Sequence, residues 1–301
     1  MKALEVKPQI TLKNILFATD FEVSASRALP FAIALADRYR AKFYAAHVIP
    51  SGAYALARPE FIDLTLEELQ AHAIRALNQM IDPLRQHGQR CGTLLGCGVV
   101  IDVLMEFVRN HGVDLVVVGT SSRGGLGKVL LGSTAEEIIR VAPCPVLTVG
   151  PHVTAVASVG VRSIVCGTDF SIGSLRAAEF AVSLAHEYQA DLTLVHVVEE
   201  VLTESPDSAI QLADRRLREM IPSEPRLLYE PEVVVEIGPV AERILAVANE
   251  LIADIIVMGV RGTGAFAQTA SHFGSIAHRV VALAHCPVMT VGDPQKVENE
   301  Y

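Results

Sequence analysis

A glycine-rich stretch between residues 119 and 134 carries the residue types that point most clearly to chemistry. It begins at Gly119 and ends in Gly132-Ser133-Thr134, where a run of helical periodicity starts. The first backbone N–H groups of a helix lack partners inside the helix and lie at its positive end, so they can bind an anion. Arg123 and Lys128 add positive charge to the same stretch. The pattern predicts a site for an anionic group such as a phosphate.

Two other apolar runs end in residues that could face a ligand. Thr19 and Asp20 follow the first run, and His47 and Val48 close the second. In open parallel sheets, ligands bind beyond the carboxyl ends of the strands, where the strand order reverses. We therefore expect Thr19, Asp20 and Val48 near the glycine-rich stretch. His47 and its counterpart His196 are assigned to packing or hydrogen bonding.

Two purely structural explanations stay open for these residues. Asp20 could cap the helix that follows it, and Ser133 could cap the helix after the glycine-rich stretch, because Asp and Ser side chains accept hydrogen bonds from the first N–H groups of a helix. The stretch would then be a turn that binds no ligand.

Familiar catalytic patterns are incomplete or missing. Gly127-Lys128-Val129 lacks the Ser or Thr with which a P-loop holds magnesium, and no G-x-S-x-G nucleophile elbow occurs. The five cysteines form no C-x-x-C pair. We expect no catalytic residue, no metal site and no disulfide framework, and a reducing, cytoplasmic location.

The sequence contains an internal duplication. Residues 14–21 (NILFATDF) recur as 163–170 (SIVCGTDF), and 144–150 (CPVLTVG) recur as 286–292 (CPVMTVG). Repeats in the same order along the chain indicate one structural unit per copy. We expect a first domain over 1–150, a linker over 151–161, a second domain over 162–292 and a polar tail over 293–301.

Within each copy, short β-branched runs alternate with helical periodicity, which predicts parallel strands joined by helices. In the first copy we expect strands at 14–19, 43–49, 92–98, 113–119 and 145–149, and helices near 23–40, 63–88, 101–111 and 133–141. The second copy follows the same plan, with a helix near 204–221. Pro30 should kink the first helix. The predicted fold class is α/β, with two tandem Rossmann-like domains, each a five-stranded parallel open sheet with helices on both faces.

Charge and hydropathy narrow the possible partners. The formal net charge is -9, which argues against nucleic acid as the main partner. Residues 1–150 carry 15 Lys and Arg against 14 Asp and Glu, whereas the remainder carries 10 against 20, so the first half is the better host for an anion. No apolar run approaches the roughly 18 residues of a membrane helix, so we expect no membrane partner.

Both copies resemble the universal stress protein family over nearly the whole chain. Nucleotide-binding members of that family carry Gly-x2-Gly-x9-Gly-(Ser/Thr) after the fourth strand. The first copy reads Gly119-x2-Ser122-x9-Gly132-Ser133, with serine in place of the middle glycine. The second reads Gly259-x2-Gly262-x11-Gly274-Ser275, with both glycines but a longer loop. Neither copy matches the motif in full.

The resemblance implies a fold like that of the adenine nucleotide alpha hydrolases, and ATP or AMP as the ligand, with magnesium bound through the phosphates if present. It places the following first-domain residues around the nucleotide: Thr19, Asp20, Val48, Gly119, Ser122, Arg123, Gly132, Ser133 and Thr134. The second-domain counterparts are Asp169, Val197, Gly259, Gly262, Gly274 and Ser275. We expect the nucleotide in the first domain, because its loop keeps the motif's outer spacing and its charge is near neutral.

The resemblance further implies a stress-response regulatory protein in which the bound nucleotide changes contacts with an unidentified protein partner. Two alternatives stay open: a dimerising interaction scaffold without nucleotide, and a slow ATP hydrolase. Family members commonly dimerise through their last strands. We therefore expect 146–149 and 288–291 to pair antiparallel as an internal pseudo-dimer, which proline at Leu147 should loosen. Association of two chains into a homodimer also stays open.

Overall fold

The computed structural model describes residues 10–51, 65–120, 131–153, 160–199, 206–221, 230–260 and 275–292. The first domain contains β1 (Asn14–Ala18), α1 (Val23–Tyr39), β2 (Lys42–Pro50), α2 (Leu66–Gln86), β3 (Cys91–Gly98), α3 (Val100–Asn110), β4 (Leu115–Gly119), α4 (Ser133–Val141) and β5 (Val146–Val149). The second contains β6 (Ser163–Gly167), α5 (Ile172–Tyr188), β7 (Asp191–Val198), α6 (Pro206–Met220), β8 (Glu232–Ile237), α7 (Val240–Glu250), β9 (Ile255–Gly259), α8 (Ser275–Leu283) and β10 (Val288–Val291).

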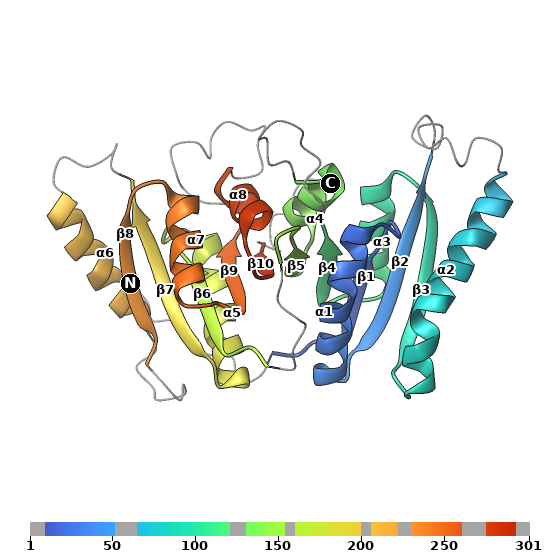
Figure 1. Cartoon of the computed structure of the whole chain (residues 1–301), viewed down its shortest axis with the longest axis horizontal. Helices are drawn as coiled ribbons and strands as arrows, with labels where there is room; N and C mark the ends of the chain where they lie inside the picture. Colours follow the sequence, from blue (N-terminus) through green and yellow to red (C-terminus); the bar gives the residue numbers. More distant parts are fainter. Residues whose placement is uncertain are drawn as a thin grey trace.

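The strands of both domains form one continuous sheet (Figure 1). Its order is β3-β2-β1-β4-β5-β10-β9-β6-β7-β8, and the strands of each domain are parallel to one another. The domains join where β5 and β10 pair antiparallel, with Leu147 opposite Met289. The pairing expected from the sequence is therefore present, and it merges the two five-stranded sheets into a ten-stranded one.

Helices cover both faces of this sheet, and each face has its own apolar core. One core contains buried residues of α1, α2, α5 and α6, and the other contains buried residues of α3, α4, α7 and α8. Helix α1 presents a stripe of alanines to the sheet (Ala25, Ala28, Ala32 and Ala36), and their small side chains let the helix lie close to the strands. Each core includes residues of both domains, so the domain junction is packed like a protein interior.

Some expectations stay untested or lie outside the described residues. Helix α1 continues through Pro30, and the kink expected there stays a prediction. Most of the expected linker and the whole expected polar tail lie outside the described residues. None of the helices that the structure describes is both long enough and apolar enough to cross a membrane.

Candidate functional site

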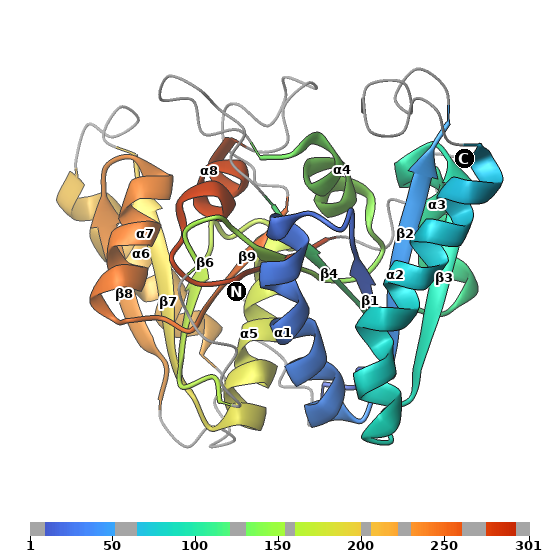
Figure 2. The ribbon, with the colours of Figure 1, turned by 45° about the vertical axis from the view of Figure 1, so that its right-hand side comes forward.

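The strand order of the first domain reverses between β1 and β4, and the predicted site residues lie at the carboxyl ends of these strands. Thr19 and Asp20 follow β1, and Thr120 follows β4. Helix α4 starts beside them, because the Gly132 N–H donates a hydrogen bond to the Thr120 hydroxyl at 3.2 Å. Figure 2 shows α4 at the edge of the sheet toward which β2 points. The fold thus brings the first-strand turn and the start of α4 to one edge.

The turn after β1 is held by its own side chains. The Thr19 hydroxyl accepts a hydrogen bond from the Phe21 N–H, and the Asp20 carboxylate accepts one from the Glu22 N–H, each at 3.0 Å. The N-cap of α1 is Glu22, so Asp20 stabilises the turn before the helix and does not cap it. Thr19 is buried, whereas the Asp20 side chain is exposed and accessible to a ligand.

The second domain repeats this turn with small changes. Asp169 accepts a hydrogen bond from the Ser171 N–H at 3.0 Å, and the Thr168 hydroxyl accepts one from the Phe170 N–H at 3.1 Å. Asp169 is half-buried, unlike its exposed counterpart Asp20. The two first-strand acids therefore share a backbone role but differ in accessibility.

His47 and His196 have the structural role assigned to them. In each, Nδ1 donates a hydrogen bond of 2.8 Å to a backbone carbonyl, that of Thr19 or Thr168. Each imidazole also packs against the phenylalanine of the adjacent turn, with ring centroids 4.4 and 4.5 Å apart. Burial lowers the pKa of His196, which favours the neutral ring.

The start of α4 differs from expectation in two ways. Gly132 is the N-cap and Ser133 is the first helical residue, so Ser133 is not the cap. The Gly132 N–H is also not free for a ligand, because Thr120 accepts it. The preceding N–H, that of Leu131, donates to Nε2 of His278 in the second domain at 3.1 Å. The N–H groups of Ser133 and Thr134 remain, and in the described part of the chain no acceptor meets them.

The structure explains glycine at position 119 of the first-domain motif, but it does not explain glycine at position 132 in the same way. A Cβ atom at Gly119 would lie 2.0 Å from the Ser24 carbonyl oxygen, so glycine is needed there for α1 to pack on β4. In the second domain, a Cβ atom at Gly259 would lie 2.8 Å from the backbone of Gly173 in α5, so glycine is needed there for the same reason. At Gly132 the nearest atom is 3.8 Å away and φ is -61°, which any residue can adopt. Packing therefore explains Gly119 and Gly259 but not Gly132.

The two valines expected at the adenine pocket are buried near the ends of β2 and β7. Val48 belongs to the same apolar core as Leu131 and Ala135 at the start of α4. Val197 lies in the corresponding core region of the second domain. Ser275 is the first residue of α8. The remaining predicted residues, Ser122, Arg123, Gly262 and Gly274, lie outside the described residues.

Sequence reasoning missed two residues at this edge. Thr120 directly follows Gly119 at the end of an apolar run, so its position at a strand end was a usable signal. His278 lies in the other domain, 147 residues from its partner Leu131, and no local pattern connects the two.

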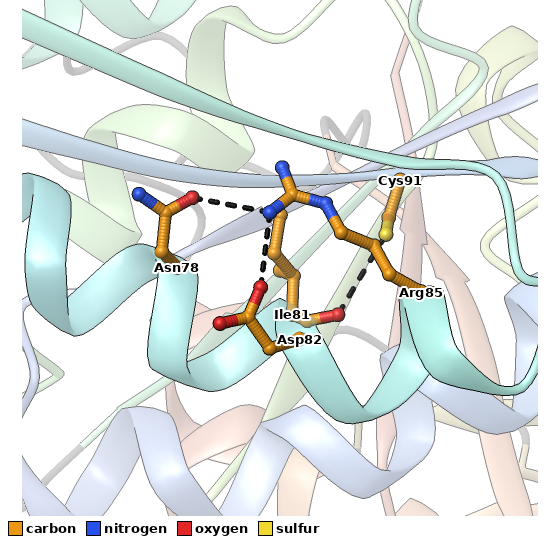
Figure 3. Close-up of polar contacts among 5 residues, drawn as sticks. All are labelled: Asn78, Ile81, Asp82, Arg85 and Cys91. Carbon is orange, nitrogen blue, oxygen red and sulfur yellow. Dashed lines mark hydrogen bonds and ion pairs between the residues drawn. The ribbon is translucent and has the colours of Figure 1, made fainter.

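Four of the five cysteines have the character of structural residues. Burial raises the pKa of Cys144, Cys166 and Cys286 to about 12 each, so their thiols stay protonated near neutral pH. Burial also raises the pKa of Cys91, whose thiol donates to the Ile81 carbonyl of α2 at 3.8 Å (Figure 3). A protonated thiol is a poor nucleophile, so the geometry supports no cysteine chemistry at these positions.

Other features of the described residues lie away from the carboxyl edge. An open groove of about 850 Å³ lies between α6 and β8, and a cleft of about 560 Å³ lies at the amino edge between the domains. The described residues include no group of three or more His, Cys, Asp or Glu side chains placed to hold a metal ion.

Comparisons with known proteins all indicate the same family. A model described as the universal stress protein family matches residues 11–150 and 160–292. Universal stress protein MJ0531 of Methanocaldococcus jannaschii is 32% identical over 141 residues, which cover 46% of this chain and 81% of that protein. A universal stress protein of Mycolicibacterium smegmatis is 28% identical over 297 residues, covering 92% of this chain and 96% of its own.

The whole two-domain arrangement also resembles a solved structure. The crystal structure of a universal stress protein from Archaeoglobus fulgidus matches with a TM-score of 0.70 at 21% identity, covering 93% of this chain and 98% of that chain. At this identity the likeness concerns the fold alone.

Proposed function

Since this chain belongs to the universal stress protein family, we propose that it binds an adenine nucleotide, ATP or AMP, at the carboxyl edge of its first domain. The observation that carries the proposal is the start of α4. There the amides of Leu131 and Gly132 are held by His278 and Thr120, while those of Ser133 and Thr134 meet no acceptor among the described residues and are proposed to bind the ligand.

This arrangement suits a phosphate group. The two amides lie at the positive end of α4, and the residues that carry them are exposed, as is Gly132. Charge-assisted hydrogen bonds from backbone N–H groups to phosphate oxygens are stronger than those between neutral groups. Gly132 lets a phosphate approach the backbone closely, and packing against the described residues gives no other reason for glycine there.

Other residues of the edge would hold the rest of the nucleotide. The exposed Asp20 carboxylate lies on the turn after β1, where it could accept hydrogen bonds from ribose hydroxyls or the adenine amino group. Val48 would supply an apolar wall for the base. Ser122 and Arg123 are proposed to contact the phosphates, and magnesium, when present, would be bound through those phosphates.

We propose a regulatory role, in which nucleotide occupancy changes the surface offered to a protein partner. The second domain is proposed to bind nucleotide weakly or not at all. Its loop has eleven residues between Gly262 and Gly274, and its half of the chain is strongly acidic. Asp169 is also less accessible than Asp20.

Titration calorimetry of the full chain with ATP, magnesium-ATP and AMP tests the proposal. We expect one site per chain, and chromatography of the denatured purified protein should detect the nucleotide it retains. An absence of binding to all three ligands would favour the interaction scaffold, and two equal sites would contradict the proposed asymmetry. Release of ADP over hours would indicate slow hydrolysis instead of sensing.

A further inference from the structure

A second site is indicated at the opposite edge of the sheet, in the cleft of about 560 Å³ between the domains. The cleft is formed by the segment before β1, the end of α1 and the residue before β3, together with the end of α5. Figure 2 shows α1 and α5 side by side on one face of the sheet. The residues that define the cleft's chemistry are Lys13, Arg38, Tyr39, Arg40, Arg90 and Glu187.

The charge of the cleft is strongly one-sided. It contains four cationic side chains against one carboxylate, and that carboxylate, Glu187, accepts a hydrogen bond from the Ile10 N–H at 3.3 Å. Within the described part of the chain, none of the four cations forms an ion pair with a carboxylate. Like charges gathered in one cleft repel one another, and an anion between them would relieve that repulsion.

Two of the guanidinium groups are positioned without being neutralised. Arg38 donates to the Glu187 backbone carbonyl at 3.0 Å and stacks on the Tyr188 ring at 4.2 Å. Arg90 donates to the Arg40 carbonyl at 2.8 Å. A guanidinium has five N–H donors, so each keeps donors for a ligand while its position is already set.

The Tyr39 hydroxyl adds a donor that no acceptor meets within the described part of the chain. Its oxygen atom is shielded from solvent and has no hydrogen-bond partner within the geometric limits among the described residues, although Tyr188 and Glu187 lie nearby. An unsatisfied buried hydroxyl costs free energy. Burial raises the pKa of Tyr39, so the group stays protonated and could donate to an oxygen of a bound anion.

The second domain shows that the fold does not require these cations. The positions that correspond to Lys13, Arg38, Arg40 and Arg90 by strand register and helix end are Arg162, Glu187, Gln189 and Glu230. The helix ends have the same backbone, with φ of 50° at Arg40 and 53° at Gln189. Arginines that only complement the end of a helix would be expected in both copies. Three of the four cations occur only in the first copy.

We propose that this cleft binds a phosphorylated small molecule that carries at least two negative charges. Arginine matches phosphate oxygens with pairs of parallel hydrogen bonds, and the volume lies in the range of roughly 300–1,000 Å³ of ligand sites. The site is separate from the proposed nucleotide site, because it lies where the parallel strands begin. It joins both domains, since Glu187 and Tyr188 belong to α5 and the cations belong to the first domain.

Titration of the full chain with inorganic pyrophosphate tests the proposal. The variant Arg38→Glu, Arg40→Gln, Arg90→Glu gives the cleft the residues of the second domain, whose fold already accommodates them. We expect saturable binding by the wild type and a loss of at least about tenfold in affinity in this variant. Tyr39→Phe, which removes a single oxygen atom, should lower the affinity for pyrophosphate several-fold. This variant tests the proposal even if the triple variant does not fold.

Two controls separate this site from other effects. Arg75→Glu, Arg109→Glu, Arg140→Gln makes the same change in net charge elsewhere on the first domain and should leave binding unchanged. Gly132→Val removes the pyrophosphate that binds at the phosphate position of the proposed nucleotide site and should leave binding in the cleft unchanged, so the cleft variants are compared in this background as well. The proposal is overturned if the wild type shows no saturable binding at millimolar pyrophosphate, or if the folded cleft variants bind as tightly as the wild type.

Discussion

Two glycines of one loop motif, Gly119 and Gly132, are explained by different physical reasons. Gly119 is required by the fold, since any side chain there would meet the Ser24 carbonyl. Gly132 has an ordinary backbone conformation, and among the described residues the atom nearest to an added Cβ is 3.8 Å away, so packing against these residues does not require glycine there. This contrast makes Gly132 the residue at which ligand binding and folding can be separated by substitution.

The substitution Gly132→Val should abolish ATP binding, with a loss of affinity of about tenfold or more, while the protein keeps its thermal stability. A branched side chain at the N-cap would occupy the space above the Ser133 and Thr134 amides and hold phosphate away from them. Calorimetry measures the affinity, and circular dichroism follows unfolding. Gly160→Val is the matched control, because Gly160 is exposed with nothing within 4 Å of an added Cβ. Undiminished affinity in folded Gly132→Val would reject this site.

At the scale of elements, the antiparallel pair β5–β10 decides how the two copies are joined. An exposed apolar edge strand invites pairing with another chain. Here each last strand covers the edge of the other, and all four residues of β5 and of β10 are buried. A homodimer would therefore have to use surfaces other than these edges.

The direction of the backbone groups identifies which residue of β5 faces the other domain. The carbonyl of Pro145 accepts a hydrogen bond from Val116 of β4 at 3.1 Å, and that of Val149 accepts one from Thr120, directly after β4, at 3.0 Å. Backbone groups of successive residues in a strand point to alternate sides, so Leu147 also faces β4, whereas Thr148 faces β10. Proline at Leu147, expected from the sequence to loosen the two halves, would instead disturb the sheet of the first domain.

Thr148→Pro should loosen the junction of the domains, because it removes a donor to β10. Loss of a net hydrogen bond of about 0.5–1.5 kcal/mol corresponds to a rise in local opening of roughly two- to tenfold. Hydrogen exchange of the amides in β10 measures this rise. In Leu147→Pro the faster exchange should concentrate in β4 and β5. Equal effects of the two variants on β10 would contradict the assigned directions.

At the scale of the whole molecule, residues of the second domain help to position the carboxyl edge of the first domain, where α4 starts. Both apolar cores run across the junction, and Gly150 lies so close to α8 that an added Cβ would be 2.6 Å from the Val281 carbonyl oxygen. His278 of α8 accepts the buried Leu131 amide just before α4. The proposed nucleotide site of one domain therefore depends on the position of the other.

His278→Leu should weaken ATP binding by the first domain several-fold, because the Leu131 amide loses its acceptor and the start of α4 is no longer held in place. His278→Gln should retain most of the affinity, since its side-chain oxygen can replace Nε2 as the acceptor. Calorimetry compares the two variants, with unfolding temperatures measured in parallel. If both variants bind ATP like the wild type, the domains are not coupled through this residue.

The sequence alone was sufficient for features that depend on local patterns. The duplication, the alternation of strands and helices and the turn after the first strand follow from short segments such as 14–21 and 163–170. The pairing of β5 with β10 could also be expected, because two matching apolar strands on one chain need a partner for their edges. Interpreting glycine spacing was less successful, since Gly119 serves helix packing and the amide of Gly132 is already bonded.

Only the tertiary structure decided which distant groups meet. Thr120 lies under the start of α4, His278 reaches Leu131 from the other domain, and Arg38 meets Glu187 at the junction. These contacts join residues 12 to 149 positions apart. They depend on how two packed domains are placed by the β5–β10 ladder, and local propensity and periodicity contain no information about that placement. The acceptors of the loop amides and the charge of the cleft are therefore properties of the assembled fold.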